Sequence, residues 1–134
     1  MSLVLFSSCG KEGKSNVKPN IILINIDDMG WNDVSFMGSE YYETPNIDSL
    51  ADQAMVFTQG YAASANCAPS RASIAVGKWT TRHQIYTVSN SDRGKAKDRK
   101  LIPIKNTTVL DQKFTTISQK LKEYGYTNCH SGKW

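Results

Sequence analysis

A run of aliphatic residues near the start of the chain constrains the fold more than any other feature. Residues 21–26 read Ile-Ile-Leu-Ile-Asn-Ile, and Pro19 separates them from a polar, lysine-containing lead. A strand with one solvated face alternates apolar and polar residues, whereas a strand covered on both faces is apolar almost throughout. The run therefore predicts a strand buried on both faces, as in a largely parallel sheet.

Three later segments have apolar residues at the spacing of an amphipathic helix. The first follows Pro45, with Asn46 as the predicted N-cap and Asp48 near the positive end of the helix dipole. Glycines mark the ends of the other two, as expected where a helix closes in the left-handed conformation. The predicted helices cover residues 45–55, 67–77 and 115–124.

Short extended segments separate these helices. Residues 56–58 and 126–129 have the composition of strands, and residues 78–108 indicate a long surface excursion. Strands that alternate with helices favour an α/β fold, with a largely parallel sheet and flanking helices. In such folds, ligands gather at the carboxyl ends of the strands.

Two adjacent carboxylates, Asp27 and Asp28, directly follow the first predicted strand, and Gly30 allows a sharp turn after them. Neighbouring carboxylates repel each other unless a cation offsets their charge. Hard oxygen ligands favour Ca²⁺ or Mg²⁺, so the pair predicts a metal site. An Asp-Asp pair is also common in turns and helix caps, and that interpretation stays open.

A thiol, a hydroxyl and a guanidinium come together in the sequence Cys67-Ala68-Pro69-Ser70-Arg71, at the start of the second predicted helix. A helix N-terminus binds anions through its free N–H groups and its dipole. Arg71 adds a planar donor fork suited to a tetrahedral oxyanion, and the same field lowers the pKa of a thiol. The segment therefore predicts an oxyanion site with Cys67 as nucleophile.

The same five residues resemble the signature of the sulfatase family, in which C-x-P-S-R precedes a T-G-R-like stretch. The resemblance covers Asn20 to Trp134 and includes three further motifs. The family's metal loop is similar to Asn25-Ile26-Asp27-Asp28-Met29-Gly30-Trp31. The helix that follows it in the family is similar to Thr44-Pro45-Asn46-Ile47-Asp48-Ser49-Leu50-Ala51. The family's G-K-W-H segment is similar to Gly132-Lys133-Trp134. The resemblance implies an alkaline-phosphatase-like α/β fold.

The resemblance also implies a reaction, a sulfuric ester hydrolysis. In sulfatases a separate maturation enzyme oxidises the motif cysteine to formylglycine, so Cys67 would carry an aldehyde that hydrates to a diol. One hydroxyl, acidified by Ca²⁺ (or Mg²⁺) on Asp27, Asp28 and residue 67, would attack the sulfur of a sulfated carbohydrate or aryl sulfate. Arg71 would orient the diol, and Lys133 would neutralise a sulfate oxygen or assist the leaving group.

Two positions depart from the family pattern, since Val76 stands where threonine is usual and Lys78 where arginine is usual. The histidine after the G-K-W segment and further metal ligands would fall beyond residue 134. On this interpretation residues 20–134 are the amino-terminal part of a sulfatase catalytic domain, truncated and inactive alone.

The first 19 residues resemble the remnant of a bacterial lipoprotein signal and a linker. Cys9 follows a short apolar stretch and two serines, and a polar segment follows it. The resemblance implies an exported protein, periplasmic or anchored in the outer membrane by lipid on Cys9. The alternative is a frayed terminus.

The formal charge of +4 includes a local concentration at Arg93, Lys95, Lys97, Arg99 and Lys100, diluted by two aspartates. No aromatic residues are interleaved with these charges, so a nucleic-acid partner is not expected. The run indicates a solvated loop or a patch that attracts an anionic polymer.

Two other functions compete with the sulfatase interpretation. A phosphonate monoester or phosphodiester hydrolase of the same superfamily can share the formylglycine and the metal site. A non-catalytic binding lipoprotein would keep Cys67 as a thiol and hold only a structural cation on Asp27 and Asp28.

Overall fold

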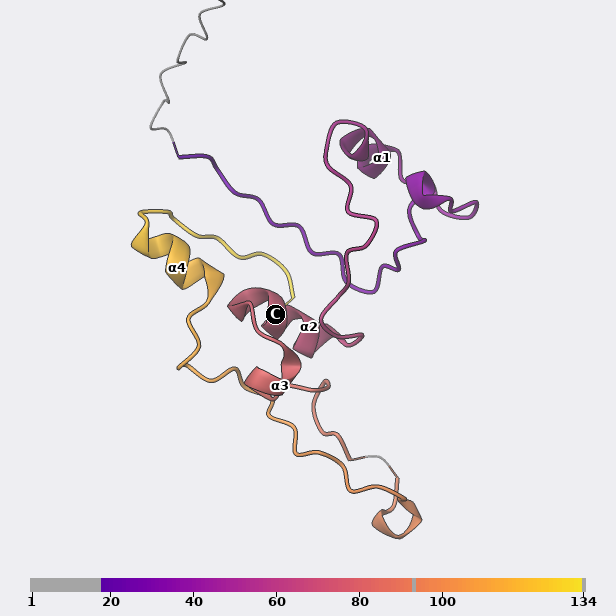
Figure 1. Cartoon of the computed structure of the whole chain (residues 1–134), viewed down its shortest axis with the longest axis vertical. Coiled ribbons are helices and arrows are strands. Elements are labelled where there is room, and N and C mark those ends of the chain that lie inside the picture. The colour runs from indigo at the N-terminus through magenta and orange to yellow at the C-terminus, as the bar shows by residue number, and fades with distance from the viewer. Residues whose placement is uncertain (1–17, 93, 134) are drawn as a thin grey trace, which may run out of the picture.

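The computed structural model describes residues 18–92 and 94–133 (Figure 1), so the predicted lipoprotein lead with Cys9 lies outside the described residues. Within those ranges all assigned elements are helices. They are the 3₁₀ helices η1 (Ser35–Met37) and η2 (Ala96–Asp98), and the α-helices α1 (Pro45–Ala51), α2 (Cys67–Val76), α3 (Thr80–His83) and α4 (Ile117–Glu123). Helix α2 packs against both α3 and α4.

The three predicted strands, at residues 21–26, 56–58 and 126–129, are wrong as assignments, because the described chain contains no strand. A strand exists only where its backbone pairs with a neighbour about 4.8 Å away. Instead, a cavity of about 410 Å³ separates part of the first segment from residues 129–133. Ile22 is accordingly 84% exposed rather than buried on both faces.

The parallel course expected of these two segments is nevertheless present. Residues 18–27 and 124–133 run in the same direction (Figure 1) and are joined at both ends. The Lys18 side chain donates a hydrogen bond to the Tyr124 carbonyl, and Lys133 bonds Asp27 at 2.7 Å. Both contacts span 106 residues, so the segments keep one register although their backbones do not pair.

Helix α2 matches the prediction for residues 67–77. Pro69 is buried in its first turn, where a missing N–H costs nothing, and Gly77 ends the helix at φ 60°. Small side chains on the inner face let neighbouring segments approach, since Ala72 is 0% exposed and Ser73 is 6% exposed. Helix α2 therefore lies at the centre of the packed helices, in contact with both α3 and α4.

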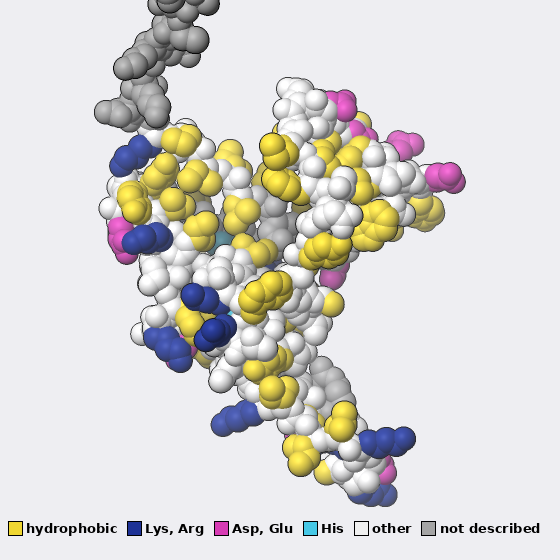
Figure 2. Space-filling model, in the orientation of Figure 1, with side chains coloured by type: hydrophobic (Ala, Val, Ile, Leu, Met, Phe, Trp, Pro, Cys, Tyr) yellow, Lys and Arg dark blue, Asp and Glu magenta, His cyan; other side chains and the backbone are white. Residues whose placement is uncertain are grey.

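The buried apolar core is small. Among the described residues, the buried hydrophobic side chains are Val34, Ala72 and Ile85. Apolar side chains are spread over the visible face of the molecule (Figure 2), and much of the segment expected to form the first strand is exposed. The predicted interior sheet position of residues 21–26 is therefore wrong in burial as well as in pairing.

The predicted surface excursion at residues 78–108 begins inside this core, so the prediction is wrong for its first part. Helix α3 packs on α2, and both His83 and Ile85 are 2% exposed. The His83 Nε2 atom lies 2.9 Å from the Ser73 hydroxyl, which gives the buried ring a polar partner. A buried histidine is tolerated where its ring nitrogens are hydrogen-bonded.

Helix α1 is shorter than predicted, and its N-cap is Thr44 rather than Asn46. Asp48 stabilises the entry to the helix by accepting hydrogen bonds from the Ser35 hydroxyl at 2.7 Å and the Thr44 hydroxyl at 2.8 Å. The bond from Ser35 is the main cause that lowers the pKa of Asp48. This network fixes η1 against α1.

Helix α4 confirms the third predicted helix with slightly narrower bounds. Thr116 and Gln119 form a reciprocal capping box, in which each side chain satisfies a free backbone N–H of the other residue. Gly125 follows the helix at φ 81°, as its predicted stop. No helix in the part of the chain that the structure describes has the length and apolar character needed to span a membrane.

Candidate active site

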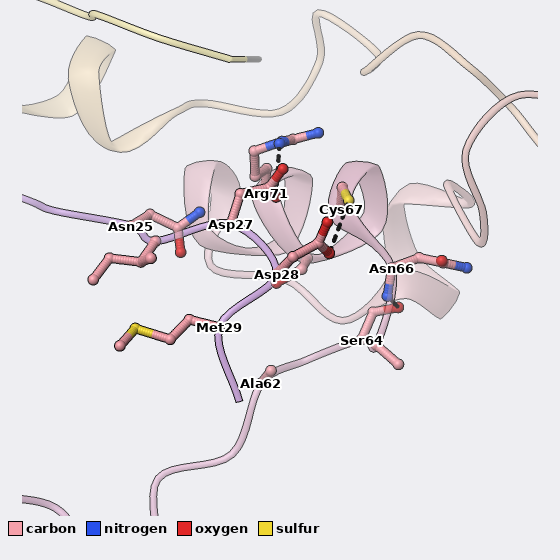
Figure 3. Close-up of a pocket in the computed structure, with 12 residues that line it drawn as sticks. Asn25, Asp27, Asp28, Met29, Ala62, Ser64, Asn66, Cys67 and Arg71 are labelled. Carbon is pink, nitrogen blue, oxygen red and sulfur yellow. Dashed lines mark hydrogen bonds and ion pairs between the residues drawn. The ribbon is translucent and has the colours of Figure 1, made fainter. Parts of the chain in front are cut away.

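The two aspartates and the cysteine of the predicted site lie together. Ligand atoms of Asp27, Asp28 and Cys67 are all within 4.8 Å of one another. Figure 3 shows the Cys67 thiol turned toward the Asp28 carboxylate, with an S–O separation of 3.9 Å. Residues 39 positions apart in the chain thus meet at the N-terminal end of α2.

Asp28 makes the turn that carries the chain past Cys67. Its φ of 57° lies in the left-handed region, which aspartate enters more easily than most residues. The turn was expected at Gly30, which has an ordinary φ but is approached closely by Asp33, whose carboxylate accepts from the Gly30 N–H at 2.7 Å. A Cβ at Gly30 would lie 2.9 Å from that oxygen, so position 30 favours glycine because a side chain would crowd the Asp33 carboxylate.

Arg71 and Lys133 both bind Asp27, one on each carboxylate oxygen. The Arg71 guanidinium lies 3.1 Å from Oδ1 and the Lys133 ammonium lies 2.7 Å from Oδ2. The bond from Lys133 is the largest cause that holds the pKa of Asp27 below its ordinary value, and the same contact raises the pKa of Lys133. The Asp27 carboxylate and the Lys133 ammonium are therefore ionised together at neutral pH.

Arg71 is the most enclosed of these charges, since its side chain is 12% exposed against 62% for Lys133. Its Nε–H is buried and has no hydrogen-bond partner among the described residues. A guanidinium that pairs with Asp27 on one side and has an N–H left over can still donate a hydrogen bond to an anionic oxygen.

Asp27, Asp28, Cys67 and Arg71 line a cavity of about 340 Å³ beside the start of α2 (Figure 3). Its walls come from the segment after the first extended stretch, from the small-residue loop before α2 and from the first turn of α2 itself. The lining residues that the sequence did not single out for the site include Asn25, Met29, Ala62, Ser64 and Asn66. The cavity is large enough for a sulfate-sized tetrahedral anion, whose surroundings are cationic on the Arg71 side.

Asn66 illustrates why sequence reasoning missed such residues. An asparagine directly before a helix signals an N-cap, but the Asn66 side chain makes no cap bond to α2. Its Nδ2 instead donates to the Thr87 hydroxyl at 3.3 Å, which ties the loop before Cys67 to a segment 21 residues later. The contact between Asn66 and Thr87 arises from the tertiary structure, so the local sequence does not predict it.

The residues present fit a hard divalent cation only in part. The carboxylates of Asp27 and Asp28 are oxygen ligands of the kind that Ca²⁺ and Mg²⁺ prefer. A thiolate suits softer metals, so the Cys67 sulfur does not belong in a Ca²⁺ site. An oxygen-bearing side chain at position 67 would add a third hard ligand to the two carboxylates.

The two departures from the expected signature lie away from the nucleophile. Val76 is the last residue of α2 and Lys78 follows its Gly77 stop, whereas Cys67 is the first residue of the helix. Ten helical residues span about 14 Å at 1.5 Å per residue. Val76 therefore lies at the opposite end of the helix from Cys67.

Comparison with known proteins identifies the family. The model of the sulfatase family matches residues 19–134. The chain belongs to the sulfatase family. The alkaline-phosphatase-like α/β fold expected from the motifs is the fold of this family, although the described residues of this sulfatase chain form no paired strands.

Similar proteins from animals and bacteria agree with this assignment. The N-acetylgalactosamine-6-sulfatase of Rattus norvegicus is 37% identical over 117 residues, which are 87% of this sulfatase chain and 21% of that protein. A sulfatase of Formosa agariphila is 36% identical over 97% of the chain and 25% of its own length. Arylsulfatase H of Canis lupus familiaris is 35% identical over 89% and 20%. The chain thus spans between a fifth and a quarter of these curated relatives.

Proposed function

We propose that this protein is a sulfuric ester hydrolase whose site is built around Cys67. The observation that carries the proposal is the meeting of five functional side chains from three distant segments: the paired aspartates, Cys67 with Arg71, and Lys133. Membership of the sulfatase family supports hydrolysis of a sulfate ester as the reaction of this cluster. The S–O bond of a sulfate ester is broken, the alcohol leaves with a proton, and water supplies the new oxygen of sulfate.

Cys67 is proposed to act after conversion to formylglycine by a maturation enzyme. The unsuitability of sulfur as a ligand beside two hard carboxylates supports this proposal, because the oxidised side chain presents oxygen in the same place. The side chain of residue 67 projects from the first turn of α2, where free N–H groups and the helix dipole stabilise an anionic oxygen.

Asp27 and Asp28 are proposed to hold Ca²⁺, or Mg²⁺, together with residue 67. When bound, the cation would supply the positive charge that acidifies an oxygen nucleophile and offsets the charge of the sulfate. The left-handed turn at Asp28 aims its carboxylate at residue 67, and Asp27 is oriented by Arg71 and Lys133. The position of the Asp27 carboxylate therefore depends on the Arg71 and Lys133 side chains.

Arg71 and Lys133 are proposed to have different roles in the reaction. Arg71 is enclosed and held on one side, so it orients residue 67 and offsets charge near the carboxylates. Lys133 is more exposed and carries a flexible ammonium, which suits it to neutralise a sulfate oxygen or to protonate the leaving alcohol. Arg71 lines the 340 Å³ cavity, and both Arg71 and Lys133 line the neighbouring cavity of about 410 Å³.

The proposed substrates are sulfated carbohydrates or aryl sulfates. Relatives named N-acetylgalactosamine-6-sulfatase and arylsulfatase support both classes. We also propose, from the sequence lead alone, that the protein is exported and anchored by lipid on Cys9. Loss of membrane association in a Cys9→Ser variant, with unchanged expression, is the test of that anchor.

The test of the function is mass spectrometry combined with turnover. The intact protein, coexpressed with a maturation enzyme, should contain formylglycine at position 67 and hydrolyse a nitrophenyl sulfate. Cys67→Ala should abolish turnover, and Cys129→Ala, which changes the other described free cysteine, should retain it. Active protein with an unmodified thiol would overturn the nucleophile. Activity on nitrophenyl phosphodiesters alone would favour the related phosphodiester or phosphonate hydrolases.

A further inference from the structure

The positive charge of the protein is concentrated in one segment, residues 88–108, here termed the basic arm. The arm contains six lysines and arginines and two aspartates, whereas the rest of the chain contains ten basic and ten acidic residues. The formal charge of +4 therefore belongs entirely to these 21 residues. A charge separated in this way creates a local positive field on a neutral body.

The basic arm projects from the helices. In Figure 1 it leaves α3 and extends away from α1, with η2 near its far end, and Figure 2 shows dark blue side chains at that end. Lys95, Lys97, Lys100 and Lys105 are exposed, and none of the four is in an ion pair among the described residues. Arg99, by contrast, pairs with Asp92 at 3.5 Å and bonds the Gly94 carbonyl.

The base of the arm is fixed by Asn106. Its side-chain oxygen accepts from the backbone N–H groups of Tyr86 at 2.7 Å and Thr87 at 3.2 Å, and its amide donates to the Thr87 carbonyl at 3.1 Å. The next residue, Thr107, bonds the Gln84 carbonyl at 3.0 Å through its backbone. The outgoing and returning parts of the arm are thereby held side by side.

This base adjoins the candidate active site. Thr87 accepts the hydrogen bond from Asn66, the residue directly before Cys67. A cavity of about 320 Å³ lies between Ala68, which follows Cys67, and the arm residues Val88, Ser89 and Thr108. The residue before the arm therefore contacts Asn66, and the base of the arm faces Ala68 across a cavity, so the arm begins near Cys67 and leads away from it.

We propose that the basic arm binds the anionic chain of a sulfated polysaccharide while one sulfate ester occupies the candidate active site. The proposal rests on the proposed function and extends it to a polymeric, polyanionic substrate class. Four unpaired lysines attract repeated sulfate groups by charge, and no geometry specific to one sugar is required. Residues 87–113 contain no aromatic side chain on which nucleobases could stack, which favours a sulfated polymer over single-stranded nucleic acid.

The test compares two variants of equal charge. In one, the four exposed lysines of the arm become glutamine, and in the control four lysines outside it do: Lys78, Lys113, Lys120 and Lys122. Binding of the intact protein to dextran sulfate and to uncharged dextran is measured by calorimetry at several salt concentrations. We expect the arm variant to bind dextran sulfate about tenfold more weakly or worse, with a shallower salt dependence, and the control to stay within about twofold.

Three results would overturn the proposal: equal losses in both variants, an unchanged affinity in the arm variant, or equally tight arm-dependent binding of a DNA oligonucleotide. The same titration on a Cys67→Ala protein separates this proposal from the proposed function. Binding there should match the wild type, because attraction to the polymer needs no nucleophile. If formylglycine is absent but arm-dependent binding persists, only the proposed function fails.

Discussion

Lys133 donates a hydrogen bond to Asp27 at 2.7 Å, although 106 residues separate the two in the chain. Arg71 takes the other oxygen of the same carboxylate at 3.1 Å. One aspartate therefore joins the first extended segment, helix α2 and the last described segment. Asp27 also forms ion pairs with two positively charged side chains, and Asp28 and Cys67 lie next to it.

Replacing Asp27 by asparagine should weaken divalent-cation binding by more than the roughly 10- to 100-fold that loss of an outer hydrogen-bond partner costs a metal site. The change removes one of two carboxylate ligands and leaves Arg71 and Lys133 as uncompensated positive charges beside the ion. Calorimetric titration of the intact protein with Ca²⁺ measures the effect. Asp52→Asn, at the end of α1, is the matched control and should bind Ca²⁺ normally. An equal affinity in Asp27→Asn would show that the ion binds elsewhere.

The sequence predicted this cluster better than it predicted the sheet. Asp27, Asp28, Cys67 and Arg71 each carry chemistry that is visible from residue type and from position at the end of a run or the start of a helix. Strand pairing has no such local signal, since it depends on a neighbour at the correct distance. Ile22 looks like a core residue from its neighbours, yet it is 84% exposed because no described segment covers it.

The helices show the same division between local and tertiary information. Gly77 and Gly125 were predicted as stops, because a left-handed residue after a helix is a local requirement. The burial of His83 could not be predicted, since it depends on Ser73 from the preceding helix lying within 2.9 Å of the ring. Thr87 beside Asn66 is a second contact of that kind.

Replacing Ser73 by alanine should destabilise the protein by about 1–3 kcal/mol, the usual cost of a buried polar group left without a partner. The His83 Nδ1 atom accepts from the Ile85 N–H at 3.2 Å, so the neutral ring carries its proton on Nε2 and donates it to Ser73. Urea unfolding measures the change. Ser49→Ala, on the exposed side of α1, should cost far less, and equal costs would contradict a stabilising hydrogen bond between Ser73 and His83.

The stability of the protein should fall as the pH decreases below about 6.5, because of His83. Burial lowers the pKa of this histidine from its ordinary 6.5, so between the two values the unfolded chain binds a proton that the folded chain does not. The stability contribution is fully present above pH 6.5 and is lost as the pH falls toward the folded pKa. Urea midpoints at pH 7.5 and 5.5 should differ less in His83→Gln, while His130→Gln, at an exposed site, should behave as the wild type.

Replacing Asn106 by alanine should release the base of the basic arm. The variant loses the side-chain bonds to the backbone of residues 86–89, including those to Tyr86 and Thr87, and leaves their N–H groups without an acceptor. Hydrogen exchange at these two amides should accelerate at least about tenfold, since one lost bond of about 1.4 kcal/mol gives that factor. Asn46→Ala, in α1, should leave both exchange rates unchanged. Unaltered exchange in Asn106→Ala would mean that other contacts hold the arm.

Replacing Gly77 by alanine should cost about 1–2 kcal/mol through the backbone alone. Gly77 ends α2 at φ 60°, a conformation that a Cβ disfavours, but an added Cβ would meet no atom within 4 Å. The cost should therefore be the same for alanine and serine, because neither side chain has a neighbour to clash with. Gly60→Ala is the control, since its φ is ordinary and its nearest atom lies at 3.4 Å.

Because Cys67 and Arg71 lie in the first half of the helix, Ca²⁺ affinity should survive in Gly77→Ala while the urea midpoint falls. A parallel loss of both would show that the end of α2 positions the site as well as stabilising the fold.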